Sequence, residues 1–297
     1  DDMRFDGIHH ITNITGDAPQ NVDYYANRLG LRMVKKTVNQ DDPTVYHLFY
    51  ADEHGSPGAD ITFFEYPGAQ RGRAGAGMIH TIVWRVGSED ALEFWRERMG
   101  AVPFEDPEGL RHDLVVAAVP DQPLIADHPE IPRELALQGF EGARAYARNV
   151  ELRTADFLDA LGFEREGDRW TTRGAERGGW IAYEPAPDEP GIPGAGTVHH
   201  IAWSSEMDDQ QEWRQRVLAA GGRPTEVIDR FWFRSVYFRE PSGVLYEIAT
   251  KGPGFSTDED PEHLGEALIL PPAFEHLRAQ IEPILTPLPN PRAATRA

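Results

Sequence analysis

The feature that most constrains the fold of this 297-residue chain is an internal repeat of a short apolar strand pattern. Its four copies start roughly 50 to 70 residues apart, which is the length of one small α/β unit rather than of a solenoid repeat. The copies are Gly7–Thr12, Met78–Val83, Ala147–Leu152 and Thr197–Ala202. After each copy come helix signals and then strand-like runs joined by Pro/Gly turns. Each unit is therefore predicted to be βαβββ, with the third unit the weakest match.

A single βαβββ unit has a sheet with one buried face, which must close against a partner. The sequence therefore predicts an α+β fold in which four βαβββ units form two paired half-barrels. A proline-containing stretch over residues 120–146 separates the second unit from the third. We place a domain boundary within it. Residues 1–135 then hold the N-terminal pair of units, and residues 136–297 hold the C-terminal pair plus a C-terminal extension, with a helix expected over residues 273–284.

Charge and composition exclude several function classes. The 29 Lys and Arg residues against 49 Asp and Glu give a net charge of −20, which argues against nucleic acid and against an anionic membrane as partners. Cysteine is absent, so disulfides, thiolate nucleophiles and zinc–cysteine sites are excluded. No apolar run is long enough to cross a bilayer, and the first residues lack the pattern of a signal peptide. We therefore expect a cytoplasmic protein.

Two of the four repeats carry the dipeptide His-His at the same strand position, as His9-His10 and His199-His200. Because side chains alternate along a strand, one histidine of each pair faces the inside of the sheet. Glu247 lies in an apolar strand pattern, where a buried carboxylate requires a compensating charge. Two imidazoles and one carboxylate that leave other positions open are typical of non-haem iron(II) oxygen chemistry. The sequence therefore predicts a metal site.

On these segments the chain resembles the vicinal oxygen chelate (glyoxalase/bleomycin resistance/extradiol dioxygenase) superfamily, and within it the ring-cleaving hydroquinone 1,2-dioxygenase branch. The resemblance rests on the two His-His strands, on Tyr237–Thr250 and on the acidic run Gly254–Pro272. It implies that the metal ligands are His10, His200 and Glu247, so that the first and last units meet at one metal. The metal implied is iron(II), with manganese(II) as the alternative.

The resemblance also implies roles for residues around the metal. It assigns catalytic roles to His199, Tyr237 and Arg230, and substrate contacts to Thr12 and His9. In these roles Tyr237 or His199 donates a hydrogen bond to the second ring hydroxyl, and Arg230 stabilises an anionic substrate. Strict alternation turns His9 and His199 away from the metal, so only twist or a β-bulge would bring either of them back.

The activity implied is the insertion of both atoms of dioxygen into a hydroquinone-type or catechol-type ring. The partners would be a small aromatic diol and dioxygen, with the choice between monomer and homo-oligomer left open. One alternative is a glyoxalase-type isomerase or lyase with a four-ligand site, in which Glu65 joins the three ligands above. A second alternative is a non-catalytic module of the same superfamily that binds an aromatic compound.

Overall fold

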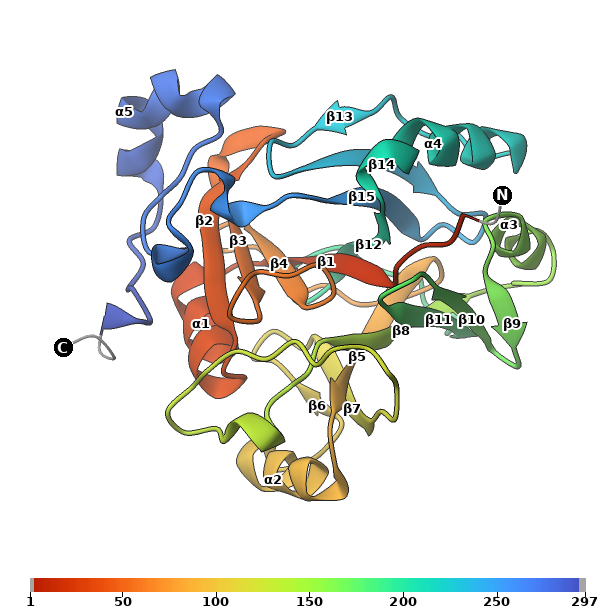
Figure 1. Ribbon diagram of the computed structural model, residues 1–297, viewed down its shortest axis with the longest axis horizontal. Coiled ribbons are helices and arrows are strands. Elements are labelled where there is room, and N and C mark those ends of the chain that lie inside the picture. Colours follow the sequence, from red (N-terminus) through yellow and green to blue (C-terminus); the bar gives the residue numbers. More distant parts are fainter. Residues whose placement is uncertain (1–2, 294–297) are drawn as a thin grey trace.

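The computed structural model describes residues 3–293 and confirms an α+β fold built from repeated units (Figure 1). The first unit comprises β1 (Ile8–Thr15), α1 (Ala18–Val22) with the π-helical turn η1 (Asp23–Arg28), β2 (Arg32–Asn39), β3 (Asp42–Ala51) and β4 (Asp60–Glu65). The fourth unit comprises β12 (Val198–Ser205), η3 (Met207–Asp209) with α4 (Gln210–Ala219), β13 (Ile228–Asp229), β14 (Phe233–Arg239) and β15 (Leu245–Pro253). Both units have the predicted βαβββ order.

The second and third units depart from the prediction. The second comprises β5 (Met78–Val86), α2 (Glu89–Met99), β6 (Phe104–Glu105) and β7 (Arg111–Val116), so it has two strands after its helix in the described chain rather than three. The third comprises β8 (Phe140–Ala147), α3 (Thr154–Ala160), β9 (Glu164–Glu166), β10 (Arg169–Arg173) and β11 (Gly178–Pro185). The third unit is therefore complete, and the expectation that it is the weakest is wrong.

The first strand of the third unit also lies earlier than predicted. The segment 147–152 mostly forms a turn ahead of α3, and Leu152 is exposed. The strand is β8, in which most of the buried residues are small: Gly142, Ala143, Ala145 and Ala147. Gly142 is needed because the ring of Trp180 on the neighbouring strand leaves no room for a Cβ atom. Small residues have low strand propensity, so packing rather than local sequence determines this strand.

Each sheet is assembled from two units. The eight-stranded sheet has the order β13-β14-β15-β12-β1-β4-β3-β2, and the seven-stranded sheet has the order β6-β7-β5-β8-β11-β10-β9. At the centre of each sheet the first strands of two units run antiparallel, β1 beside β12 and β5 beside β8 (Figure 1). The first unit therefore pairs with the fourth, and the second pairs with the third. The domain boundary at residue 135 stays a prediction, but each sheet takes one unit from either side of it.

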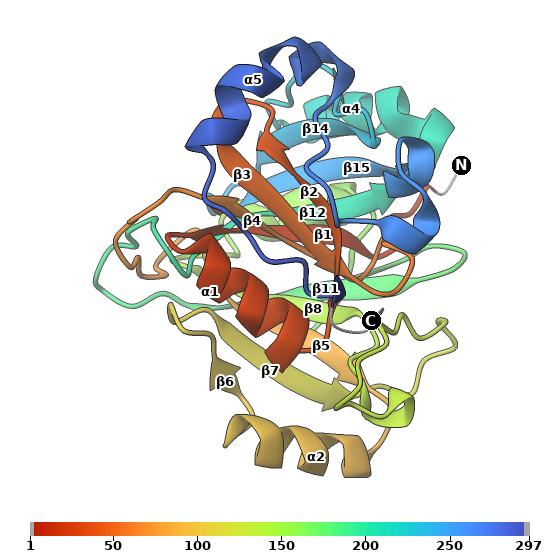
Figure 2. The same cartoon turned by 90° about the vertical axis from the view of Figure 1, so that its left-hand side faces the viewer.

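Helices α1 and α2 begin at residues whose side chains cap them, and helices cover the sheets. Asp17 accepts a hydrogen bond from the Gln20 amide at the start of α1, and Ser88 accepts one from the Ala91 amide at the start of α2. Helix α2 packs on β7, and α4 packs on β14 and β15. Figure 2 shows α1 between the two sheets and α2 at the far side of the smaller one. The functional site described below lies on the inner face of the eight-stranded sheet.

The C-terminal extension runs back along the first unit. Its short helical turns are η4 (Phe255–Thr257), η5 (Pro261–His263), η6 (Pro272–Leu277), α5 (Arg278–Ile281) and η7 (Glu282–Ile284), and a further turn, η2 (Arg133–Leu135), precedes β8. The helix expected over residues 273–284 is thus a chain of three short turns. The Ile269 amide donates to the carbonyl of Lys36 on β2, so the extension lies against that strand. Within residues 3–293 no helix is long and apolar enough to cross a membrane.

Candidate metal centre and aromatic cavity

Three buried side chains from the first and last units meet on the inner face of the eight-stranded sheet. His10 lies on β1, His200 on β12 and Glu247 on β15, and all three are at most 4% exposed. The His10 Nε2 atom is 2.6 Å from Glu247 Oε2 and 3.3 Å from His200 Nε2, and His200 Nε2 is 3.4 Å from the same carboxylate oxygen. A ligand atom from each residue lies within 4.8 Å of the others, so this group has the geometry to hold a metal ion.

The hydrogen bonds around His10 fix which of its nitrogen atoms carries the proton. His9 Nε2 lies 3.0 Å from the Thr250 carbonyl, which only accepts, so His9 donates from Nε2 and accepts at Nδ1. His10 Nδ1 lies 2.8 Å from His9 Nδ1 and must therefore donate to it. This leaves the Nε2 of His10 as a bare lone pair directed at Glu247. Such backing of a ligand histidine by a second group is typical of metal sites.

Apart from the two histidines, no hydrogen-bond donor in the described chain reaches the buried carboxylate oxygens of Glu247. Burial alone would raise its pKa, but the imidazoles of His10 and His200 in their protonated forms outweigh this and hold the pKa of Glu247 well below its usual value, so the carboxylate is ionised. Once those imidazole protons are released, an ionised carboxylate and two imidazole lone pairs face one another at the centre of the protein. Acceptors that converge without a proton between them are stabilised by a cation, and a divalent metal ion fits this donor set.

Both His-His pairs lie at irregularities of strand register. Between β1 and β12, Ile8 pairs with Trp203 and His10 with Ala202, so the extra residue on β1 is His9. Two pairs further along, the register shifts again, and the extra residue is His199 on β12. A β-bulge of this kind turns the side chain of the extra residue. At each bulge the Nδ1 atom of the first histidine lies 2.8 Å from that of the second. The expectation that a bulge brings one of them back to a bound substrate stays a prediction.

The two bulged histidines differ in their surroundings. Burial, with His10 adding to the effect, lowers the pKa of His9 to about 3. His9 is thus neutral and held in place by Thr250. The Nδ1 atom of His199 lies 2.8 Å from that of His200, but the His199 side chain is exposed to a cavity beside the three acceptors. Partial burial and the neighbouring His200 lower the pKa of His199 to about 4, so it is also neutral at pH 7.

This cavity has a volume of about 400 Å³ and is reached from the inner face of the sheet. The ligand group lies in its wall, and six aromatic side chains form part of the remaining wall. The aromatic lining residues are Phe49, Phe64, Tyr66, Trp232, Phe233 and Tyr237. A pocket of this size with apolar walls and a few convergent polar groups is suited to a small aromatic ligand. The ring of His47 packs against Phe49 and Phe64, with centroids 4.1 and 4.4 Å away.

Arg230 and Tyr237 form a polar pair in the same wall. Arg230 donates from Nε to the Tyr237 hydroxyl at 3.3 Å, and its guanidinium lies 5.3 Å from the centre of the tyrosine ring. Burial raises the pKa of Tyr237 well above its usual value, and the nearby charge of Glu247 raises it further. The hydroxyl of Tyr237 therefore stays protonated and is available to donate a hydrogen bond into the cavity.

The acidic run of the C-terminal extension fixes one wall of the cavity. The side chain of Lys35, on β2, is fully buried, and its Nζ atom lies 2.9 Å from Asp258 and 2.5 Å from Glu259. The same ammonium group lies 4.9 Å from the ring of Trp232, whose indole nitrogen donates to Asp258. A buried cation paired with two carboxylates is retained only when its partners stay in place. The cluster of Lys35, Asp258 and Glu259 therefore holds the C-terminal extension against the part of the cavity wall that contains Trp232.

The remaining predicted residues lie in two places. His199, Tyr237 and Arg230 line the cavity, whereas Thr12 and His9 lie behind the lining residues. The assignment of Thr12 and His9 to substrate contact stays a prediction.

Glu65, the fourth ligand of the isomerase alternative, is not part of the ligand group. Instead it accepts hydrogen bonds from the Ala18 amide at the start of α1 and from Thr286.

Sequence reasoning missed two polar residues of the cavity wall, His47 and Asp41. His47 is better explained as a lining residue than as the exposed or capping histidine that its isolated position suggests. Alternation along β3 places it on the same face as Phe49, and this pattern was the available signal. Asp41 lies in the turn between β2 and β3, and nothing in its local sequence indicates a partner on the fourth unit.

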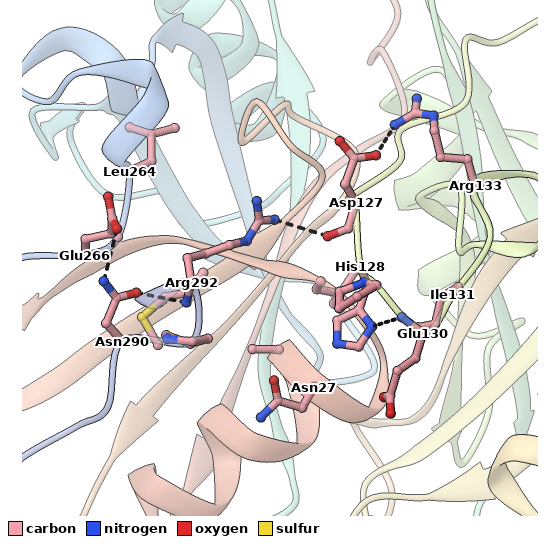
Figure 3. A pocket seen from close by; sticks show the side chains of 16 residues that line it. Asn27, Asp127, His128, Glu130, Ile131, Arg133, Leu264, Glu266, Asn290 and Arg292 are labelled. Atoms are coloured by element: carbon pink, nitrogen blue, oxygen red, sulfur yellow. Dashed lines mark hydrogen bonds and ion pairs between the residues drawn. The ribbon is translucent and has the colours of Figure 1, made fainter. Parts of the chain in front are cut away.

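A larger cavity of about 740 Å³ lies elsewhere, between η1, residues 127–133 and the C-terminal extension (Figure 3). Its charged side chains are directed at one another rather than at a common centre. Arg133 pairs with Asp127, Arg292 also reaches the Asp127 carbonyl, and Asn290 donates to Glu266 (Figure 3). This cavity contains no group of metal ligands among the described residues.

Comparisons with known proteins agree with this fold. The chain matches the family model described as the Glyoxalase/Bleomycin resistance protein/Dioxygenase superfamily over residues 7–113 and 149–248, and it belongs to that superfamily. It is 40% identical to the Bacillus subtilis (strain 168) protein named "Putative ring-cleaving dioxygenase MhqO", over 95% of this chain and 96% of that one.

A second relative is 32% identical and is the "Chlorohydroquinone/hydroquinone 1,2-dioxygenase" of Sphingobium indicum, matched over 94% of this chain and 95% of the relative. A crystal structure of a Bacillus subtilis protein described as a "putative dioxygenase" superposes with a TM-score of 0.89 at 39% identity, covering 97% of this chain and 98% of the other. The similarity therefore extends over nearly the whole chain, including both ends of the ligand group.

Proposed function

We propose that this protein is a non-haem iron(II)-dependent ring-cleaving dioxygenase that acts on hydroquinone-type aromatic diols, with catechol-type diols as the related substrate class. One observation carries the proposal. The ligand group consists of two imidazoles and one carboxylate beside an aromatic cavity. Thr62 pairs with Thr12, two residues beyond His10, just as Glu247 pairs with Ala202, two residues beyond His200, so a hydroxyl rather than a carboxylate stands at the corresponding fourth position. A three-ligand set with open positions is typical of iron(II) oxygenases. The names of the relatives support the same activity.

His10, His200 and Glu247 would hold the metal, with His9 fixing the proton on His10. Iron(II), when bound, supplies a redox-active Lewis acid with open positions for the diol and for dioxygen. Manganese(II) would fit the same nitrogen and oxygen donors and is the alternative metal.

The cavity residues would position the diol and handle its protons. The aromatic walls hold the ring in a fixed orientation, so that its reacting carbon stays next to the metal. His199 is neutral and on the wall; its Nδ1 accepts from His200, so its Nε2–H donates a hydrogen bond to a ring oxygen. Tyr237, held by Arg230 and kept protonated by burial, donates a hydrogen bond to the oxygen of the other hydroxyl as negative charge develops there.

Two alternatives remain distinguishable by experiment. A glyoxalase-type isomerase or lyase would need a fourth ligand, and Glu65 lies outside the ligand group. A non-catalytic binding module would not need three proton-free acceptors beside its cavity, since an unoccupied group of this kind is costly to bury.

The decisive experiment is reconstitution with iron(II) or manganese(II) under nitrogen, followed by oxygen-uptake measurements with hydroquinone and catechol side by side. We expect stoichiometric oxygen consumption with hydroquinone, and both atoms of labelled dioxygen in the open-chain product. A metal-loaded protein that binds the diol without consuming oxygen would overturn the proposal in favour of a binding module or isomerase. Turnover of catechol alone would overturn the hydroquinone assignment.

A further inference from the structure

The lining of the cavity contains one permanently charged cation among the described residues, Arg230, and its guanidinium is already engaged. Its Nη1 and Nη2 atoms donate to the two carboxylate oxygens of Asp41 at 3.2 and 3.1 Å. Its Nε donates to Tyr237, and its backbone carbonyl accepts from the Gln40 side chain at 2.8 Å. The turn between β2 and β3, which is part of the first unit, therefore binds Arg230, which is part of the fourth unit.

We propose that Asp41 makes this cavity select substrates by the charge of their ring substituents. The site then accepts aromatic diols with uncharged substituents and rejects those that carry a carboxylate. This inference rests on the proposed function, and it narrows the substrate to hydroquinones that bear hydrogen, halogen or alkyl groups. Nothing in the sequence around Asp41 assigns it such a role.

The argument follows from the geometry of the pair. A guanidinium binds one carboxylate through two parallel hydrogen bonds, and Asp41 already occupies this edge of Arg230. A ring carboxylate would have to displace Asp41 or bind without a cationic partner. It would also approach the carboxylate of Asp41 in the cavity lining. An uncharged substituent would neither displace Asp41 nor be repelled by its carboxylate, and Phe49 and Phe233 offer it apolar contact. Asp41 thus acts as a repulsive element against the wrong ligand.

The position of Asp41 allows this role to be tested without unfolding the protein. Its side chain is 75% exposed, whereas that of Arg230 is 15% exposed. Removing the charge of Asp41 therefore frees the guanidinium without opening the core. Asp42 provides a matched control, because it is the next residue, carries the same charge, and bonds locally to Thr44 outside the cavity lining.

The experiment measures binding to the iron(II)-loaded protein under nitrogen, so it does not depend on turnover. The two probes are ethylhydroquinone and 2,5-dihydroxyphenylacetate, which share the ring diol and differ in the charge of a side chain of similar size. We expect the native protein to bind ethylhydroquinone more tightly by roughly tenfold or more. D41N should shift the ratio toward the carboxylate by a similar factor, D42N should leave it unchanged, and the double variant D41N/R230Q should lose the gain.

Each other outcome overturns a specific statement. Equal binding of both probes by the native protein, or an unchanged ratio in D41N with native iron content and melting temperature, would overturn the role of Asp41. Binding of neither diol by the native protein would overturn the substrate class together with the proposed function. Normal probe selectivity without oxygen uptake would overturn the proposed dioxygenase activity and leave the role of Asp41 intact.

Discussion

Glu247 and Thr62 occupy corresponding positions in the two halves of the eight-stranded sheet. Glu247 pairs with Ala202, two residues beyond His200, and Thr62 pairs with Thr12, two residues beyond His10. The internal repeat therefore creates four equivalent positions around one centre, of which two hold histidine, one holds glutamate and one holds threonine. The Thr62 hydroxyl instead contacts the Thr12 hydroxyl at 2.7 Å and His47 Nε2 at 2.9 Å.

This relationship predicts the effect of placing a carboxylate at the fourth position. In T62E the metal would gain a fourth protein ligand, so its affinity should rise while an open position is lost. We expect oxygen uptake with hydroquinone to fall by about a hundredfold, with full metal content measured by chelator competition. T62V, which removes the hydroxyl but keeps the size, is the control and should retain activity within about tenfold. Full oxygen uptake by metal-loaded T62E would contradict the proposed arrangement.

Glu247 should affect both metal affinity and the stability of the metal-free protein. In E247Q the uncharged amide binds metal poorly, so metal affinity should fall by at least about a hundredfold. Without metal the same change removes a carboxylate whose ionised form His10 and His200 stabilise, and we expect the free energy of unfolding to fall by about 1–3 kcal/mol. Calorimetry with and without iron(II) tests both effects. E65Q, which changes a buried carboxylate outside the ligand group, is the control and should bind metal normally; a metal-binding E247Q would remove this residue as a ligand.

His9 should act on the metal through His10 rather than on the substrate directly. H9F removes the acceptor that keeps the proton on His10 Nδ1, so we expect metal affinity to fall by about 10- to 100-fold. His80 lies at the matching register irregularity of the smaller sheet, away from the ligand group, so H80F is the control. Metal affinity is measured by competition with a chromophoric chelator. Equal loss in both variants would point to a general folding effect instead.

His112 should make stability depend on pH independently of the metal. Burial lowers its pKa from 6.5 to about 3 in the folded protein. Trp84 donates to its Nδ1 at 3.0 Å, its Nε2 lies 2.9 Å from the Tyr25 hydroxyl, and that hydroxyl donates to Asp106. The unfolded chain therefore takes up a proton as the pH falls below 6.5 while the folded protein does not, so stability is lost in that direction.

The loss amounts to about 1.4 kcal/mol per pH unit, or roughly 2 kcal/mol between pH 6.5 and pH 5. Urea unfolding at about pH 7.5 and pH 5 in metal-free buffer measures it. H112F should be less stable at both pH values because it leaves the indole N–H of Trp84 without an acceptor. The loss of stability between the two pH values should, however, be smaller in H112F by the amount given above. Identical pH dependence in the two proteins would show that His112 is not kept neutral by the fold.

The parts of the fold and site that sequence predicted are those with a local pattern. The His-His dipeptides and the apolar strand around Glu247 are visible within a few residues, and the resemblance implied that the first and last units meet. Strict alternation of side chains along a strand would turn His9 and His199 away from the centre that His10 and His200 share. The bulges at His9 and His199 follow from this conflict. All of these depend on short-range periodicity, which a single sequence records well.

What sequence could not predict depends on distant contacts. Strand β8 buries mostly small residues, of which Gly142 is required by the ring of Trp180, and the second unit stops one strand short without a local signal. Asp41 gains its partner only when the turn after β2 meets the fourth unit. Likewise, the acidic run after β15 is an ordinary charged segment until the buried Lys35 pairs with it. Such pairings are set by tertiary register, which no local propensity encodes.

The pairing of β1 with β12, and of β12 with β15, has a consequence for how the site is assembled. His10 and His200 lie 190 positions apart in the chain, so the ribosome makes β1 long before β12 and β15. Until β12 has been synthesised, one edge of β1 has no neighbour and His10 stands without its two partners. A metal ion that needs all three side chains would therefore be captured only after the fourth unit has joined the first.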